Sequence, residues 1–140
     1  MKKNLFIINN EKCIKKNSNI YCQNLEIKLL AKDLKKFFNL FFILRKSKTE
    51  PVHILECENI SIHSNIISYI SKILFSCFSK NAKYLIISIT PYTFLSFIVL
   101  FILRKKTFLY LRSDGKKEIN LILEKNFSYL YKIVEKLMCY

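Results

Sequence analysis

The chain has 140 residues, of which 51% are hydrophobic and 14% aromatic, so we expect a single folded domain over residues 1–140 and exclude a disordered chain. Its 24 lysines and arginines against 10 acidic residues give a net charge of +14, which suits a membrane surface, an anionic substrate or nucleic acid. Gly115 is the only glycine, which excludes the GxGxxG and GxxxxGK[ST] phosphate-binding loops from these residues.

The positive charge is carried mainly by lysine, in a chain that is also rich in asparagine and isoleucine. Arginine, whose planar fork suits phosphate, occurs only at Arg45, Arg104 and Arg112. The aromatic residues lie inside apolar runs and are not interleaved with basic residues, so core packing explains them better than base stacking. We therefore expect no nucleic-acid partner. Biased composition, or a role in weak attraction to a membrane surface, explains the positive charge better.

The cysteines and histidines predict neither a metal site nor a bound cofactor. The five cysteines have no CxxC spacing, which is typical of reduced thiols in a cytosolic protein. A pairing of Cys13 with Cys22, or a metal bound by them, stays open, because their spacing is not diagnostic. His53 and His63 are expected to be surface or core residues.

The first part of the chain predicts a strand, a helix and a second strand. The apolar run Asn4–Asn9 is typical of a buried parallel strand, followed by a polar loop over Glu11–Tyr21. Asn24 can cap a helix from Leu25 to about Lys36, whose core face would hold Leu25, Leu29, Leu30 and Leu34. Phe37–Leu44 then predicts a second strand.

The middle of the chain continues this alternation. Val52–Leu55 indicates a short third strand, and Ser64–Phe78 a helix capped by Ser64 or Asn65. Tyr84–Thr90 predicts the next strand, and Thr90-Pro91 the cap and first residue of a helix over Tyr92–Leu103. We then expect a strand over Thr107–Leu111 and helices up to Met138. Such alternation predicts an α/β fold with a mostly parallel sheet, a Rossmann-like three-layer domain.

The densest polar sequence follows the last predicted strand, at the edge where parallel sheets bind ligands. It contains Arg112, Ser113, Asp114, Gly115 and Glu118. Free helix amides beside Arg112 would form an anion site. Simple helix capping by Asp114 explains the same pattern equally well. Thr90 and Pro91, and Asn9 and Asn10 after the first strand, are further candidates for the same edge, although capping and turn formation explain them too.

The run Tyr84–Leu103 contains no charged residue and is long enough to cross a bilayer. An alternative is therefore a small membrane protein anchored by residues 84–103, with Arg104, Lys105 and Lys106 on the cytoplasmic side. Pro91 and the hydroxyl residues within the run favour a strand followed by a buried helix.

The segments NLFIINN, YLIISITPYTFL and above all KTFLYLRSDGKKE resemble the N-terminal domain of bacterial two-domain glycosyltransferases of the GT-B type, and they look closest to glycosyltransferase family 4. The resemblance implies an acceptor-side domain of an enzyme that moves a sugar from a nucleotide-sugar to a cell-envelope glycan or lipid acceptor. It implies that Arg112, Ser113, Asp114, Gly115 and Glu118 line the cleft, and Thr90 and Pro91 match the preceding loop of the family. Together with Asn10, which follows the first strand, we expect Arg112, Ser113, Gly115, Thr90 and Pro91 to bind substrate, with Asp114 and Glu118 as the best catalytic candidates.

The same resemblance implies a cytoplasmic protein, peripheral on the inner face of the membrane. The second domain, which holds the nucleotide-sugar in this family, is absent from these 140 residues. We therefore expect a truncated or split form that is inactive without a partner.

Overall fold

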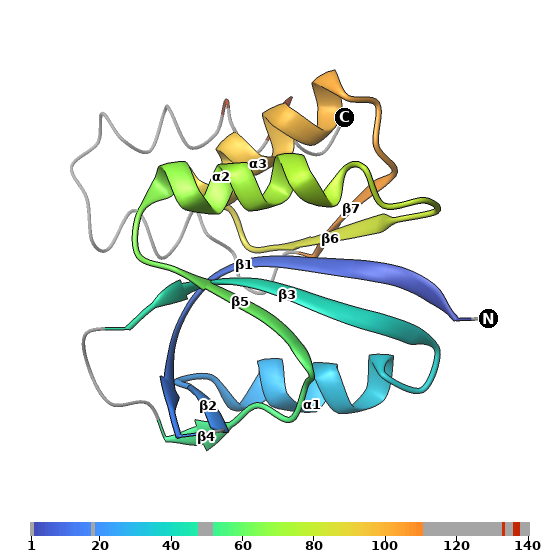
Figure 1. The fold of residues 1–140 in the computed structure, drawn as a ribbon. Helices are drawn as coiled ribbons and strands as arrows, with labels where there is room; N and C mark the ends of the chain where they lie inside the picture. Colours follow the sequence, from blue (N-terminus) through green and yellow to red (C-terminus); the bar gives the residue numbers. More distant parts are fainter. Residues whose placement is uncertain (1, 18, 48–51, 111–132, 134–135, 138–140) are drawn as a thin grey trace.

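The structure, a computed structural model, describes residues 2–17, 19–47, 52–110, 133, 136 and 137 (Figure 1). Within these residues the chain forms seven strands in one sheet and three helices. The fold is mixed α/β, as the alternation of patterns predicts. The two helices expected after Gly115 lie outside the described residues, apart from three isolated positions.

Five strands of the sheet run parallel. The central strand β1 (Lys3–Lys16) pairs with β3 (Phe38–Lys46) on one edge, and β3 pairs with β5 (Asn59–His63). On its other edge β1 pairs with β6 (Lys83–Ile87), and β6 pairs with β7 (Thr107–Tyr110). The parallel order is therefore β5-β3-β1-β6-β7. Strands are confirmed within the predicted runs 37–44, 84–90 and 107–111, although β6 already ends at Ile87, Leu111 lies outside the described residues, and β5 has no counterpart in the prediction.

A hairpin extends the sheet beyond the parallel strands. After a register shift between Ile8 and Lys12, β1 continues to Lys16 and pairs antiparallel with β2 (Asn19–Cys22). The short strand β4 (His53–Ile54) adds to β2, also antiparallel. The predicted polar loop over Glu11–Tyr21 is therefore wrong. This stretch lies at the border of the sheet. Its exposed lysines alternate with a few residues that point into the core, so the sequence shows no apolar run from which a strand could be predicted.

The three helices begin at the predicted caps. Helix α1 (Leu25–Leu34) begins after Asn24, whose side chain accepts from the Glu26 amide, and α2 (Ile66–Ser76) begins after Asn65. Helix α3 (Pro91–Ile102) begins with a capping box in which Thr90 and Thr93 each accept from the other's backbone amide. These side chains satisfy amides that the first helical turn leaves free.

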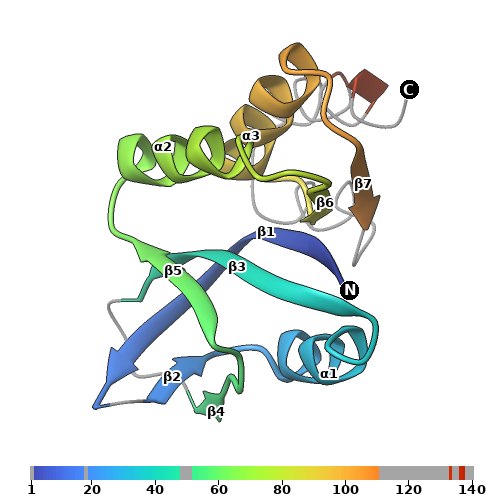
Figure 2. The ribbon, with the colours of Figure 1, turned by 45° about the vertical axis from the view of Figure 1, so that its right-hand side comes forward.

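The core lies on both faces of the sheet, because successive strand residues point to opposite sides. On one face, strand residues such as Leu5, Ile7 and Phe42 pack with Ile27 and Ala31 of α1. The other face carries α2 and α3, which lie on the opposite side of the sheet from α1 (Figures 1 and 2). Both faces of the central strands are therefore buried.

The buried face of α1 differs from the predicted one. Ile27 and Ala31 are buried, whereas Leu25 and Leu29 are 48% and 51% exposed. Ile27 and Ala31 are one turn apart and form the narrow stripe of α1 that contacts the sheet. The leucines of α1 lie at the margin of this stripe or outside it. The predicted core positions Leu25 and Leu29 are therefore wrong.

Residues 84–103, the expected alternative membrane anchor, form two elements: most of β6 and then α3. Among the described residues, none of the helices has the length and apolar character needed to cross a bilayer.

Candidate functional site

A group of polar and aromatic side chains gathers where the parallel strands end at their carboxyl termini. It draws on β1, β3, β5, α2 and α3, and we call it the strand-end cluster: Asn9, Asn10, Arg45, His63, Tyr69 and Tyr92. Parallel α/β folds bind their ligands at this edge, so the cluster occupies the position where a site is expected.

Tyr69 lies at the centre of the strand-end cluster and is fully buried. Its hydroxyl group donates to the backbone oxygen of Asn9 at 2.9 Å and also approaches that of Ile43 at 3.3 Å. These bonds tie α2 to the adjacent strands β1 and β3. Burial raises the pKa of the Tyr69 hydroxyl above its ordinary range, so the group stays a neutral donor.

The aromatic rings connect Tyr69 to both sides of the cluster. Tyr69 meets Tyr92 edge to face, with ring centroids 5.4 Å apart, and meets His63 in the same way at 6.0 Å. Such edge-to-face contacts fix the relative orientation of the rings. The rings therefore place the side chains that surround them.

Arg45 supplies the positive charge of the cluster. Its guanidinium carbon lies 4.1 Å from the centroid of the Tyr92 ring, and its Nη1 donates to Asn10 Oδ1 at 2.9 Å. Both contacts hold the guanidinium in place, and its remaining N–H groups form a preorganised fork for an oxygen-rich ligand.

Two buried polar atoms of the cluster have no hydrogen-bond partner among the residues that the structure describes. Asn9 is 5% exposed, and its Oδ1 accepts from the Glu11 amide at 3.2 Å, while its Nδ2 has no partner. His63 Nδ1 lies 3.2 Å from Ser68 Oγ, while its Nε2 is buried without a partner. Unpaired buried polar groups cost free energy and call for an explanation.

The protonation of His63 also follows from its surroundings. Burial, and to a lesser extent the positive charge of Lys72, lower the pKa of His63 below its ordinary value of 6.5. The ring is therefore neutral at pH 7 and can accept a proton or a hydrogen bond.

Of the residues predicted for substrate binding, Asn10 lies in the strand-end cluster. Thr90 and Pro91 form the beginning of α3, where the Thr90 hydroxyl is engaged with Thr93 at 3.1 Å. The capping alternative therefore describes the contacts that Thr90 makes.

The other predicted site residues, Arg112, Ser113, Asp114, Gly115 and Glu118, lie outside the described residues. The described chain ends its last strand at Tyr110, whose backbone oxygen accepts from the Ser88 amide at 3.0 Å. Ser88 follows β6 in the left-handed region, with a φ of 64°, a conformation that costs energy in a residue other than glycine. Its backbone oxygen accepts from the Thr93 hydroxyl, which stabilises this turn.

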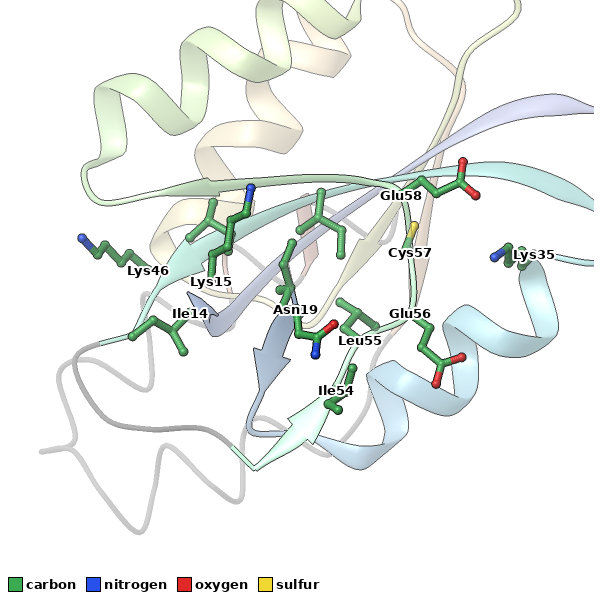
Figure 3. A pocket seen from close by; sticks show the side chains of 13 residues that line it. Ile14, Lys15, Asn19, Lys35, Lys46, Ile54, Leu55, Glu56, Cys57 and Glu58 are labelled. Carbon is green, nitrogen blue, oxygen red and sulfur yellow. The ribbon is translucent and has the colours of Figure 1, made fainter. Parts of the chain in front are cut away.

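A large hollow lies on the face of the sheet that carries α1, opposite the face on which Tyr69 and Tyr92 of the strand-end cluster pack. It is an open groove of about 820 Å³ between the β1–β2 hairpin and the chain from β4 to β5 (Figure 3). Ile20, Leu55 and Ile60 contribute apolar surface, while Lys15 and Lys46 lie on one side and Glu56 and Glu58 on the other. The groove reaches Lys46 and Ile62 at the carboxyl ends of β3 and β5, and none of its lining residues belongs to the strand-end cluster.

The comparisons with known proteins give no family for this chain: no family model, curated protein or solved structure matches it. Sequence patterns also fail to identify Arg45, His63, Tyr69 and Tyr92 as site residues. The available signal for Arg45 was its position directly after an apolar strand. The two tyrosines lie within helical apolar patterns, where a core position is the usual expectation.

Proposed function

We propose that this chain is the acceptor-binding half of a GT-B type glycosyltransferase, which moves a sugar from a nucleotide-sugar to a cell-envelope glycan or lipid. The observation that carries the proposal is the strand-end cluster on a parallel sheet. Counted along the chain, the parallel strands lie in the order 3-2-1-4-5, which is the order of doubly wound nucleotide-binding folds. We therefore propose a Rossmann-like three-layer arrangement.

The strand-end cluster lies next to the point where this strand order reverses, between β1 and β6. Open α/β sheets bind ligands at such a point, because the loops diverge there. The Arg45 fork, the Asn9 amide group and neutral His63 offer donors and an acceptor to sugar hydroxyls.

The nucleotide-sugar needs a second domain in this proposal. With Gly115 as their single glycine, these 140 residues cannot form the glycine-rich loop that brings backbone amides against phosphate. A separate donor-binding domain would supply that contact, and transfer would take place between the two. Arg112, Asp114 and Glu118 remain proposed residues of the acceptor side.

A transfer assay tests this function. Radiolabelled UDP-glucose, UDP-N-acetylglucosamine and GDP-mannose are incubated with cell-envelope lipid, the chain and a GT-B donor-binding domain added in trans. We expect label in the lipid fraction, a loss of about tenfold or more for Arg45→Met, and no loss for Lys32→Met on the exposed side of α1. Transfer that proceeds equally with Arg45→Met and Asp114→Ala contradicts the proposed site.

We further propose that the chain contacts an anionic membrane surface through the ends of α2 and α3. Residues 59–110 contain six lysines and arginines and no acidic residue. At the carboxyl ends of these helices Phe75, Phe78 and Phe101 are 72%, 85% and 72% exposed. Exposed aromatic side chains beside cations are typical of helices that lie in the membrane interface.

Flotation with vesicles tests this contact. We expect the chain to bind vesicles that contain phosphatidylglycerol and to bind pure phosphatidylcholine more weakly. Replacing Phe75 and Phe78 by Ser should weaken binding by about tenfold or more, because it removes apolar area from the interface. Phe37→Ser is the matched control, because Phe37 is 69% exposed on a different part of the surface. Equal losses for both variants contradict the proposed surface.

A further inference from the structure

Two cysteines face each other across the β1–β2 hairpin. Cys13 and Cys22 are direct partners in the antiparallel ladder, and each is a free thiol with no exposed area. Both belong to the apolar cluster on the α1 face of the sheet. Their side chains therefore lie on the same side of neighbouring strands.

The backbone hydrogen bonds show which kind of cross-strand pair this is. The Ser47 amide donates to the backbone oxygen of Cys13 at 2.8 Å, so the peptide groups of Cys13 face β3 and not β2. The Leu55 amide donates to the backbone oxygen of Ile20 at 2.8 Å, so the peptide groups of Ile20 face away from β1. The peptide groups of Cys22, two residues later in the same strand, face the same way.

Cys13 and Cys22 thus form a non-hydrogen-bonded pair. The Cα atoms of such pairs lie about 4.5 Å apart, closer than in the hydrogen-bonded kind. This spacing falls within the range of about 4.4–6.8 Å that disulfides require. The hairpin can therefore accept a bond between the two sulfurs without moving its backbone far.

We propose that Cys13 and Cys22 are a modification site, at which a reversible disulfide forms by exchange with a low-molecular-weight disulfide such as oxidised glutathione. The Cys22 thiolate attacks one sulfur of glutathione disulfide, forms a mixed disulfide and releases one glutathione thiolate. The Cys13 thiol then loses its proton and attacks the Cys22 sulfur, which releases the second glutathione. Two protein thiols are oxidised and one glutathione disulfide is reduced to two thiols.

The surroundings of the pair favour this order of attack. The hydrogen bond between the two thiols lowers the pKa of Cys22, and the same contact, together with burial, raises the pKa of Cys13. In the closed hairpin Cys22 is therefore the thiol of the pair that loses its proton more readily. Since both sulfurs are buried, exchange requires the hairpin to open. Among the described residues, β2 pairs on its outer side with the two residues of β4, so few backbone hydrogen bonds hold this border of the sheet and it can open locally.

The bond would close the loop between Cys13 and Cys22 and restrict the unfolded chain. For a loop of this length, we expect the unfolding equilibrium constant to fall on the order of 100-fold. The inference is independent of the glycosyltransferase proposal, because it rests on the hairpin alone.

The experiment equilibrates the full chain in glutathione buffers of increasing oxidised fraction, at a urea concentration below the unfolding transition. Free thiols are then blocked with N-ethylmaleimide, and the peptides are analysed by mass spectrometry. We expect the peptides containing Cys13 and Cys22 to be joined with the loss of two hydrogens, and dithiothreitol to separate them again. The oxidised chain should unfold at a higher urea concentration than the reduced one.

Single variants complete the experiment. Cys13→Ser and Cys22→Ser should abolish the joined peptide and the shift in unfolding, while Cys57→Ser, which removes a half-buried thiol, should leave both unchanged. The joined peptide in the wild-type chain tests the inference even where a variant fails to fold. Complete alkylation of Cys13 and Cys22 after equilibration in oxidised glutathione, or a disulfide that lowers stability, would overturn the inference.

Discussion

Replacement of Tyr69 by Phe tests whether its hydroxyl holds the strand-end cluster together. The change keeps the buried ring and removes the hydroxyl that donates to Asn9 and lies near Ile43. A hydrogen bond contributes about 1 kcal/mol net, whereas removing only its donor costs about 1–3 kcal/mol, because the buried carbonyl is left without a partner. Since Ile43 and Asn9 keep their strand contacts, we expect a total loss of about 2 kcal/mol in the free energy of unfolding.

Urea denaturation of the two chains measures this loss, with circular dichroism as the signal. A loss of about 2 kcal/mol corresponds to a decrease of roughly 7 °C in the melting temperature for a chain of this size. The control is Tyr84→Phe, which alters a tyrosine with no exposed area in the same way. The Tyr84 hydroxyl lies 3.3 Å from Ser76 Oγ, which already donates to the Ile73 oxygen at 2.6 Å. Its removal should cost less than about 1 kcal/mol. Equal losses, or a Tyr69→Phe loss below about 0.5 kcal/mol, would refute the reasoning.

Three further changes test other parts of the structure by the same denaturation assay. Ile27→Ala should lower the free energy of unfolding by about 2–4 kcal/mol because it leaves a cavity under α1, whereas Leu29→Ala should lower it by under about 1 kcal/mol. A larger loss for Leu29→Ala than for Ile27→Ala would instead support a core face made of leucines. Arg104 follows the C-cap of α3 at a φ of 51°, a conformation that glycine adopts without strain, so Arg104→Gly should stabilise the chain by about 0.5–1 kcal/mol. A loss of stability would contradict strain at Arg104. The lowered pKa of His63 means that the unfolded chain binds its proton first as pH falls below 6.5, so stability should decrease there and His63→Gln should reduce this decrease. A pH profile unchanged in His63→Gln would contradict the assignment to His63.

The sequence predicts those elements whose local signals agree with the fold. Asn24, Asn65 and Thr90 identify the starts of all three described helices, because a cap is a contact between neighbours in the chain. Four of the five parallel strands, β1, β3, β6 and β7, follow from apolar runs of strand length, whereas β5 does not. Pro91 also acts locally, at the first position of a helix, and correctly divides the run 84–103 into a strand and a helix. Hydrophobicity alone would join the two into one segment.

The missed features depend on contacts between distant parts of the chain. Nothing local shows that Cys13 and Cys22 share a ladder position, so the hairpin was predicted as a loop. The buried stripe of α1 depends on where the helix crosses the sheet, which local periodicity does not contain. The same holds for the strand-end cluster, since Tyr69 and Asn9 are 60 positions apart.

The central claim, that the strand-end cluster binds a sugar, is tested most directly by nuclear magnetic resonance. The ¹⁵N-labelled chain is titrated with glucose, galactose, mannose and N-acetylglucosamine, and the side-chain signals of Asn9, Asn10 and His63 are followed. We predict that at least one of these sugars shifts all three signals and leaves the side chain of exposed Asn39 unchanged. If none of them shifts the cluster signals more than that of Asn39, the claim is contradicted.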